Sequence, residues 1–355
     1  LARGNRPLRT RTGPNMTVTE TLAAFPRTAL THRPTPVEFM PNLSAAVGGV
    51  DLYVKRDDCT GLAMGGNKAR QLEFYLGEAL EQGASAVLIT GAVQSNYVRS
   101  TAAAAAKLGL RCIVQLEQRV PDMPELYHRS GNVLLDHVLG AEVRTFPEGE
   151  NEAGADAELE RVAAELAAAG ERPYVIHLSG GHPPLGALGY VDAATEIVEQ
   201  ATSMQIDFGT VVVPSGSAMT HAGLLVGLRA LGAADLRVIG VCVRRAVAAQ
   251  RERVHQCAVA TAGLLQMDLE LNIEDIEVTD DFLGPGYGRI GPAGKEAILQ
   301  AARHEGLLLD PVYTGKAFAC FLDYAASGAL GDRPALFVHT GGTPALFGYG
   351  AGVAG

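Results

Sequence analysis

The sequence predicts an α/β protein whose parallel sheets are covered by helices on both faces. Short, continuously apolar runs alternate with longer Ala- and Leu-rich stretches, and glycines follow several of the apolar runs. The chain has 355 residues, 47% of them hydrophobic and 19% charged, which suits two packed units and excludes a disordered chain. Because no Pro- or Ser-rich linker divides it, one domain is expected to be inserted in the other.

The individual elements follow from the same periodicity. Aliphatic runs too short for helices are expected to be buried strands at residues 86–90, 112–116, 174–178, 210–213, 238–243 and 335–339. Helical patterns are expected at residues 100–108, 162–169 and 189–200 and in a segment ending at Leu139. In an α/β sheet the ligand binds where the strands end, so the loops after these runs are the candidate sites.

Charge and cysteine usage exclude several classes of protein. The net charge is −10 with a pI near 5.4, which argues against a general nucleic-acid binder. No apolar run reaches the roughly 18 residues of a membrane span. The five cysteines are dispersed, which favours reduced thiols in a cytoplasmic protein. Residues 1–15 are expected to be disordered or foreign to the natural chain, with Met16 as a possible natural start.

Lys68 is the most conspicuous chemical candidate. It follows Gly65-Gly66-Asn67 in the expected first turn of a helix, where the positive end of the helix dipole should lower the pKa of its amine. A lowered pKa is what an imine-forming lysine needs. The alternative is an ordinary solvated lysine.

Two further loops offer anion sites at helix starts. Ser95 and Asn96 follow the strand at 86–90, and their amides and side chains suit a carboxylate or a phosphate. The segment 214–223 combines small residues and hydroxyls, which suits a dianionic phosphate ester. The alternatives are a plain helix N-cap and a plain glycine turn. Tyr313, Thr314 and Thr340, in two later loops, carry no signal in isolation.

Taken together and in this order, the loops resemble the fold type II, tryptophan-synthase β-like enzymes that use pyridoxal 5′-phosphate (PLP). More narrowly, they resemble the D-cysteine desulfhydrase and 1-aminocyclopropane-1-carboxylate (ACC) deaminase family. The resemblance runs from about Arg27 to Tyr349. The segments that carry it are KRDDCTGLAMGGNKAR, GAVQSNYVR, GNVLLDH, GPGYG, LLLDPVYTGKA and HTGG.

The resemblance implies a set of binding residues. Lys68 would hold PLP as a Schiff base, and Asn96 would bond the 3′-oxygen of the cofactor. The phosphate would lie against Ser217, Ala218, Met219 and Thr220, the ring would stack on Tyr287, and Thr314 and Thr340 would also contact the cofactor. A small amino-acid substrate would meet Ser95, Asn96, Tyr97, Tyr287 and Tyr313.

The resemblance also implies the organisation of the chain. It predicts two three-layer α/β/α domains with mostly parallel sheets. The smaller domain, residues 70–182, would be inserted in a larger PLP domain formed by residues 16–69 and 183–355. A homodimer is expected by analogy with relatives, and no metal.

The two threonines favour β-elimination. In the loops that resemble those of ACC deaminases, those enzymes have Y-E-G-K and H-L-G-G patterns, whereas this chain has Thr314 and Thr340 at the second positions. A carboxylate beside the pyridine nitrogen makes a strong electron sink for ring opening, whereas a neutral threonine suffices when a good β-leaving group departs. D-cysteine desulfhydrase activity is therefore expected, and L-cysteate sulfo-lyase is the main alternative. ACC deaminase, a serine- or threonine-type dehydratase and a non-catalytic PLP- or amino-acid-binding protein stay open.

The expected mechanism assigns a step to each of two residues. The substrate amine would displace Lys68 from its Schiff base with the cofactor, and the freed lysine would then remove the Cα proton. Tyr313 would assist departure of the β-substituent. Aminoacrylate is released and hydrolyses to pyruvate and ammonia. The sequence departs from the family pattern at Ala218-Met219, where glycines are usual, and at Tyr97, where histidine or glutamine is common.

Overall fold

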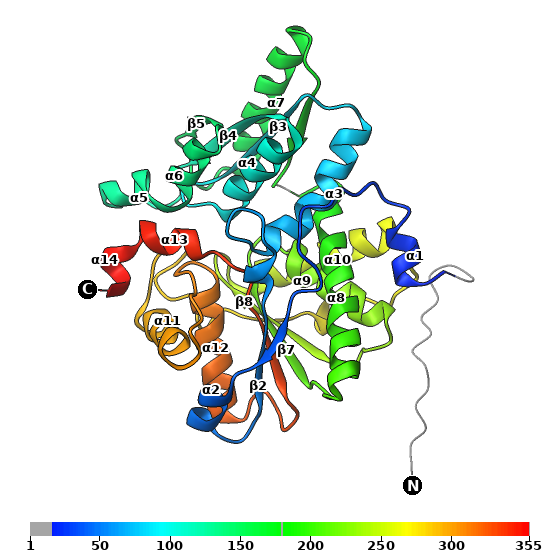
Figure 1. Ribbon diagram of the computed structural model, residues 1–355, viewed down its shortest axis with the longest axis vertical. Coiled ribbons are helices and arrows are strands. Elements are labelled where there is room, and N and C mark those ends of the chain that lie inside the picture. The colour runs from blue at the N-terminus through cyan, green and yellow to red at the C-terminus, as the bar shows by residue number, and fades with distance from the viewer. Residues whose placement is uncertain (1–15, 179, 355) are drawn as a thin grey trace.

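The computed structural model describes residues 16–178 and 180–354, so the expectation for residues 1–15 lies outside the described residues. Its chain forms two β-sheets, each with helices on both faces (Figure 1). This confirms the predicted α/β class. No helix of the described part is both long and apolar enough to cross a membrane.

The larger sheet has six strands in the order β1-β2-β10-β7-β8-β9. All neighbours are parallel except β1, which is antiparallel to β2. Residues far apart in sequence therefore meet: Val54 lies opposite Phe337, and Phe337 opposite Val212. The strands are β1 (Val37–Phe39), β2 (Leu52–Lys55), β7 (Thr210–Ser215), β8 (Arg237–Cys242), β9 (Glu277–Thr279) and β10 (Ala335–Val338).

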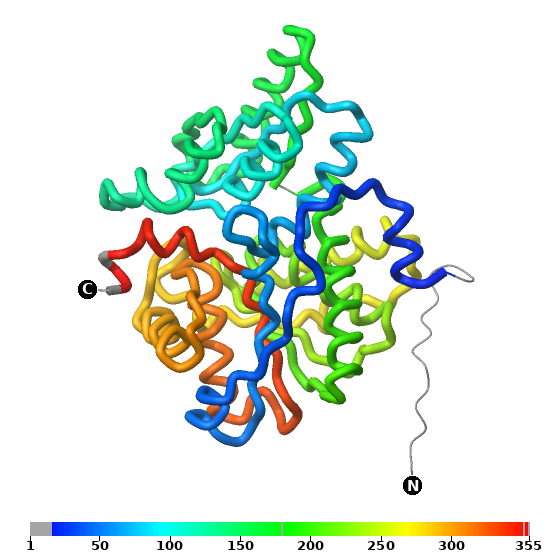
Figure 2. The backbone as a smooth tube through the Cα atoms, in the orientation of Figure 1, coloured from blue at the N-terminus to red at the C-terminus, as the bar shows by residue number. Residues whose placement is uncertain are grey.

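The smaller sheet has four parallel strands in the order β5-β4-β3-β6. They are β3 (Ala86–Ala92), β4 (Arg111–Glu117), β5 (Glu142–Phe146) and β6 (Pro173–Ile176). All four fall within the segment 70–182 that was expected to be the inserted domain, although its boundaries stay a prediction. The chain enters this unit through α3 and leaves it through α8 (Figure 2).

Helices pack on the sheets through apolar faces. On the larger sheet, α8 and α9 form one covering layer, and α2, α11 and α12 form the other. On the smaller sheet, α4 and α7 lie on opposite faces. The longer helices are α3 (Asn67–Glu81), α4 (Asn96–Leu108), α6 (Gly131–Val138), α7 (Glu152–Ala168), α8 (Leu185–Met204), α9 (Met219–Ala230), α10 (Val247–Leu264), α11 (Pro292–Glu305) and α12 (Thr314–Ser327). The shorter ones are α1 (Val18–Leu22), α2 (Pro41–Val47), α5 (Glu125–Arg129), α13 (Thr343–Gly348), α14 (Gly350–Ala354), η1 (Asp57–Cys59) and η2 (Ile273–Asp275).

All six predicted strands are confirmed, as β3, β4, β6, β7, β8 and β10, with ends that differ by a few residues. The central ones are buried along their whole length, because helices cover both faces. The loops at their carboxyl ends converge on the space between the two sheets. Ser95, Ser217, Ala218 and Thr340 lie in those loops, and the other candidate residues lie in helices or in other loops.

Candidate active site

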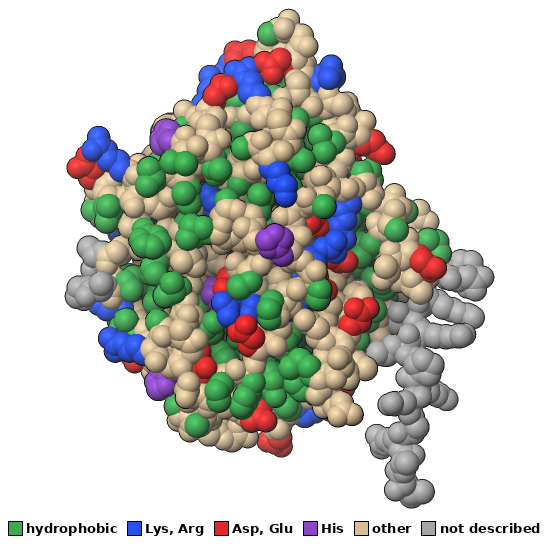
Figure 3. Space-filling view, in the orientation of Figure 1, with side chains coloured by type: hydrophobic (Ala, Val, Ile, Leu, Met, Phe, Trp, Pro, Cys, Tyr) green, Lys and Arg blue, Asp and Glu red, His purple; other side chains and the backbone are tan. Residues whose placement is uncertain are grey.

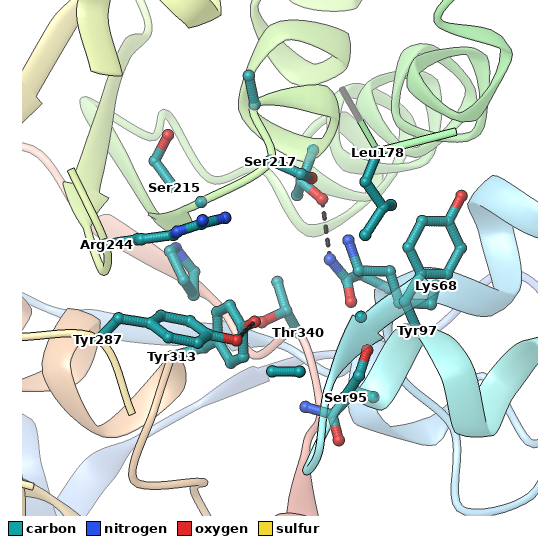
Figure 4. Close-up of a pocket in the computed structure, with 18 of the residues that line it drawn as sticks. Lys68, Ser95, Tyr97, Leu178, Ser215, Ser217, Arg244, Tyr287, Tyr313 and Thr340 are labelled. Atoms are coloured by element: carbon teal, nitrogen blue, oxygen red, sulfur yellow. Dashed lines mark hydrogen bonds between the residues drawn. The ribbon is translucent and has the colours of Figure 1, made fainter. Parts of the chain in front are cut away.

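A cavity of about 890 Å³, part of it open to solvent, lies between the two sheets. Loops after β3, β7 and β10 and the start of α3 form much of its wall. Ten of the residues predicted from the sequence line it: Lys68, Ser95, Asn96, Tyr97, Ser217, Ala218, Thr220, Tyr287, Tyr313 and Thr340. Figure 4 shows Tyr287 and Tyr313 on one side of this cavity, and Lys68, Tyr97 and Ser95 on the other.

The start of α3 is held by the loop after β10. The amide of Asn67 donates to the carbonyl oxygen of Thr340 at 3.0 Å. Gly341 packs so closely on Gly66 that a Cβ at Gly341 would lie 2.6 Å from the Cα of Gly66. The close packing of Gly65-Gly66 on Gly341-Gly342 therefore requires glycine on both sides, and it sets the position of Lys68.

Lys68 projects into the cavity without a carboxylate partner among the described residues. Its Nζ donates to Oε1 of Gln71 at 3.3 Å and lies 4.7 Å from the centre of the Tyr97 ring. Burial lowers the pKa of Lys68 to about 8. The lowered pKa agrees with the expectation from the sequence, and the cause that the structure shows is loss of hydration on burial.

The other four lysines of the chain, all in its described part, do not line the cavity. Lys55 is buried and bonded to Glu196 at 2.9 Å. Lys316 also has a pKa lowered to about 8 by burial, but its ammonium donates to the backbone carbonyls of Leu283 and Gly286. Lys68 is thus the lysine whose amine faces space that a ligand can fill.

Ser95 and Asn96 begin α4. Oγ of Ser95 accepts a hydrogen bond from the amide of Val98 at 3.2 Å, so the plain N-cap interpretation also holds. Its hydroxyl proton is not used by that bond. Asn96 accepts through Oδ1 from Nδ2 of Asn132 at 2.9 Å.

The loop from Ser215 to Thr220 leads into the start of α9, where the sequence predicts an anion site. Ala218 has a φ of 80°, a left-handed conformation that explains why glycine suits this position. Oγ1 of Thr220 accepts from Nδ2 of Asn67 at 2.8 Å and from Nε2 of Gln71 at 2.9 Å. With both lone pairs used, this hydroxyl can offer only its proton to the cavity, as binding an anion requires.

Tyr287 and Tyr313 act as a pair. Their hydroxyl oxygens lie 2.7 Å apart, and their rings meet edge to face with centroids 6.1 Å apart. Burial raises the pKa of Tyr313 well above its ordinary value, so this phenol stays protonated. The guanidinium of Arg244 lies 5.8 Å from the centre of the Tyr287 ring.

The structure does not bring Met219 and Thr314 to the cavity wall. Met219 is the first residue of α9, and its sulfur lies 3.6 Å from the hydroxyl of Tyr75. The hydroxyl of Thr314 donates to Asp310 at 2.8 Å and accepts from the Asp310 amide at 2.7 Å. Their contacts with a cofactor stay predictions.

An ionic cluster that no sequence pattern predicted lies at the cavity. Arg244, Arg245 and Arg253 surround Glu152, with nitrogen–oxygen distances of 2.5, 2.7 and 3.3 Å. Glu152 begins α7 of the smaller unit, whereas the arginines follow β8. The cluster joins the two units, and no local pattern could reveal a contact across about a hundred residues.

The donor set fits the cofactor that the resemblance implies. The α9 helix start and the hydroxyl proton of Thr220 suit a dianionic phosphate. The amine of Lys68 suits an aldehyde carbon, and the ring of Tyr287 suits an aromatic ring. Within the described ranges, five cations line the cavity against two carboxylates: Lys68, Arg119, Arg244, Arg245 and Arg253 against Glu152 and Asp310. An anionic ligand is therefore favoured.

Comparisons with known proteins agree with this geometry. A family model described as "Pyridoxal-phosphate dependent enzyme" matches residues 28–341. Proteins named D-cysteine desulfhydrase from Salmonella choleraesuis (strain SC-B67) and Salmonella typhi are each 46% identical over 334 residues, covering 92% of this chain and 97% of the relative.

Solved structures give the same result for the fold. A crystal structure of an ACC deaminase homologue superposes with a TM-score of 0.85 and 38% identity, over 95% of this chain and 98% of that one. O-ureido-L-serine synthase superposes with a TM-score of 0.64 over 94% of this chain and 96% of that one. At 16% identity, the second structure supports the fold alone.

Proposed function

This chain belongs to the pyridoxal-phosphate-dependent enzymes, and on that premise we propose that it is a D-cysteine desulfhydrase. The reaction converts D-cysteine and water to pyruvate, hydrogen sulfide and ammonia. The observation that carries the proposal is the amine of Lys68, which faces a cation-rich cavity without a carboxylate partner in the described part of the chain. The 46% identity to D-cysteine desulfhydrases over most of both chains supports this substrate over L-cysteate or ACC.

Residues of several loops would hold the cofactor. Lys68 would bind it through Nζ and Asn96 through its amide, with Tyr287 and Thr340 at the ring. The phosphate would take the α9 start, where Ser217, Ala218, Met219 and Thr220 lie and Thr220 has a proton to donate. When bound, PLP supplies an electron sink for the charge left when Cα loses its proton.

Lys68 would move that proton. With a pKa lowered to about 8, a useful fraction of its amines is neutral near physiological pH, as a general base requires. The ring of Tyr97, 4.7 Å from Nζ, limits the directions that the amine can take. Ser95, whose hydroxyl proton is free of its cap bond, would hold the substrate carboxylate.

Tyr313 would protonate the departing sulfur. Its phenol is kept protonated by burial and lies 2.7 Å from the hydroxyl of Tyr287, which can return the proton. Both tyrosines lie across the cavity from Lys68 (Figure 4). Proton removal and proton donation would therefore come from opposite sides of the substrate.

The surroundings of Asp310 support elimination over ring opening. The two oxygens of this carboxylate accept from the amides of Val312, Tyr313 and Thr314 and from the Thr314 hydroxyl, at 2.7–3.0 Å. A carboxylate accepts about four hydrogen bonds, so Asp310 has little capacity left for a pyridine nitrogen. Thr314, where the ACC deaminase pattern has a glutamate, adds no negative charge here, and its hydroxyl is bonded to Asp310, which suits a good leaving group such as sulfide.

The proposal extends to a homodimer in a reducing compartment such as the cytoplasm. Leu134, Val138 and Phe347 are 51%, 72% and 58% exposed on the neighbouring helices α6 and α13, and green apolar side chains gather on that side of the molecule in Figure 3. The five cysteines, all in the described part, are free. Sedimentation of the purified enzyme tests the dimer.

One assay tests the function. Purified protein is loaded with PLP and supplied separately with D-cysteine, L-cysteate, D-serine and ACC, while pyruvate, 2-oxobutyrate, sulfide and sulfite are measured. We expect sulfide and pyruvate in equal amounts from D-cysteine, and neither from Lys68→Ala. Faster turnover of L-cysteate or ACC, or no turnover of any substrate, would overturn the assignment.

A further inference from the structure

Asn132 lies behind the cavity wall and has no function assigned so far. It is fully buried on α6, in the GNVLLDH segment, and does not line the cavity itself. Its side chain nevertheless bonds Asn96, which does line it. A buried amide in such a place can determine how the neighbouring amide is turned.

The orientation of the Asn132 amide is set by a charged donor. A guanidinium can only donate hydrogen bonds, so the atom that Nε of Arg99 meets at 3.3 Å must be the oxygen Oδ1 of Asn132. Nδ2 of Asn132 then faces the other way. It donates to Oδ1 of Asn96 at 2.9 Å and to the carbonyl of Gln94 at 3.1 Å.

The orientation of the Asn96 amide follows from that of Asn132. Since Nδ2 of Asn132 can only donate, the Asn96 atom that it meets is Oδ1, and the Asn96 NH₂ group is turned away from it. That NH₂ group donates to no residue of the described ranges, while Asn96 is partly exposed on the cavity wall. What Asn96 offers the ligand is therefore a donor, which matches an anionic oxygen.

Arg99 couples this arrangement to Lys68. Its NH1 donates to the carbonyls of Ala63 and Gly65 at 2.6 and 3.0 Å, in the loop that leads to Lys68. Like Asn132, Arg99 is fully buried, so these bonds face no competition from bulk water. One guanidinium thus holds both the loop before Lys68 and the side-chain amide of Asn132 that bonds Asn96.

We propose that Asn132 is a positioning residue that keeps the NH₂ group of Asn96 aimed at the anionic ring oxygen of bound PLP. The proposal rests on the proposed function. It makes a directional claim: reversing the polarity of residue 132 should reverse what Asn96 presents. Asn132→Asp does this at nearly constant volume, because one oxygen can still accept from Arg99 and the other can accept from Asn96, although the hydrogen bond to the Gln94 carbonyl is lost.

The readout is the visible absorbance of bound PLP as a function of pH. If Asn96 turns its NH₂ group toward the carboxylate introduced at position 132, its carbonyl faces the ring oxygen, and the anionic form of the chromophore loses a hydrogen bond. A charge-assisted hydrogen bond contributes enough to raise the apparent pKa of the absorbance transition by about 1 unit or more. The dissociation constant for PLP should rise by about tenfold for the same reason.

Gln115→Glu is the matched control. Gln115 is a buried amide on β4, bonded to the carbonyl of Ala155 at 3.0 Å, and it does not line the cavity. This variant also buries an acid in the smaller unit, but it leaves Arg99, Asn132 and Asn96 unchanged, so its absorbance should titrate as in the wild type. Should Asn132→Asp not fold, Asn132→Ala removes the donor without adding charge and should shift the transition in the same direction by less.

The outcomes separate the two claims. An Asn132 variant that binds PLP and titrates like the wild type overturns this inference alone, as does an equal shift in the Gln115→Glu control. A wild-type protein that takes up no PLP overturns the inference and the proposed function together. A shift in the Asn132 variants with an unchanged control supports the positioning of Asn96.

Discussion

Lys68 and Arg70 lie two residues apart on α3 but have opposite electrostatic surroundings. Arg70 is fully buried and paired, with nitrogen–oxygen distances of 2.8–2.9 Å to Asp57 and Glu196, and these carboxylates raise the pKa of its guanidinium. Lys68 has no carboxylate partner among the residues that the structure describes, and burial lowers the pKa of its amine. One helix face is thus built for stability, and the face beside it keeps a lysine that is easily deprotonated.

The buried charges around Arg70 are paired with one another. Glu196 also accepts from Lys55 at 2.9 Å, and Asp57 accepts from the hydroxyl of Tyr190 at 2.6 Å. Two cations and two carboxylates thus meet with each charge satisfied, which is the condition under which buried charges are tolerated. This cluster joins η1, α3 and α8, and so holds in place the helix that presents Lys68.

Removing Lys68 should give the largest functional effect. We expect Lys68→Ala to lower turnover of D-cysteine by at least about 10³-fold, because the base and the cofactor-binding amine are lost together. Steady-state pyruvate production measures it. Lys107→Ala, at an exposed lysine, should retain wild-type turnover. Equal losses in both variants would show that Lys68 has no special part in the reaction.

Breaking the Arg70 face should instead cost stability. Arg70→Met leaves the buried carboxylate of Asp57 without its guanidinium partner and Glu196 with Lys55 alone, and we expect the free energy of unfolding to fall by about 3–5 kcal/mol. Urea unfolding followed by circular dichroism measures this. Arg111→Met removes solvent-exposed pairs with Glu142 and Glu171 and should leave the free energy of unfolding nearly unchanged. A small effect at Arg70 would contradict the structural assignment of this face.

Tyr313→Phe tests the side of the cavity opposite Lys68. Loss of the phenol should lower kcat for D-cysteine by about 10²-fold, since a general acid typically contributes that much or more. Retention of PLP, read from the absorbance spectrum, should be unchanged. Unchanged turnover in this variant would assign sulfur protonation to another group.

The pH dependence of stability tests the desolvation of the Lys68 amine. In the cofactor-free protein the pKa of Lys68 is about 8, whereas an unfolded lysine titrates near about 10.4, so the unfolded chain binds more protons between these values. The contribution of Lys68 to stability is therefore unfavourable below pH 8 and improves as the pH rises through that window.

Lys68→Met should accordingly be more stable than the wild type at pH 7, by about 1–3 kcal/mol, with the difference disappearing near pH 10. Thermal unfolding of both proteins at several pH values measures it. A variant less stable than the wild type at pH 7 would show that the Lys68 amine is not desolvated.

Sequence patterns predicted the elements and loops that depend on local order. Buried strands such as β3 and β7 are read from continuous aliphatic runs, and a helix start after Gly65-Gly66 is read from the chain itself. β2 was missed because it is short and ends at Lys55, whose burial makes sense only beside Glu196, 141 residues away. The arginines around Glu152 were missed for the same reason.

The pKa of Lys68 shows a different limit. The local sequence indicated the direction of its shift from the helix dipole, but it could not show the burial by residues from other segments, such as Tyr97, that lowers this pKa in the folded chain. Similarly, Thr314 was expected at the cofactor, and only the folded chain shows its hydroxyl engaged by Asp310. Local sequence indicates which groups are available, and tertiary packing decides which of them face the ligand.

The most direct test of the account is to find the lysine that carries the cofactor. PLP-loaded enzyme is reduced with borohydride, digested and mapped by mass spectrometry across the peptides that hold the five lysines. The account predicts a phosphopyridoxyl group on Lys68 at close to one per chain. The same group on Lys55 or Lys316, with Lys68 unmodified, would contradict it.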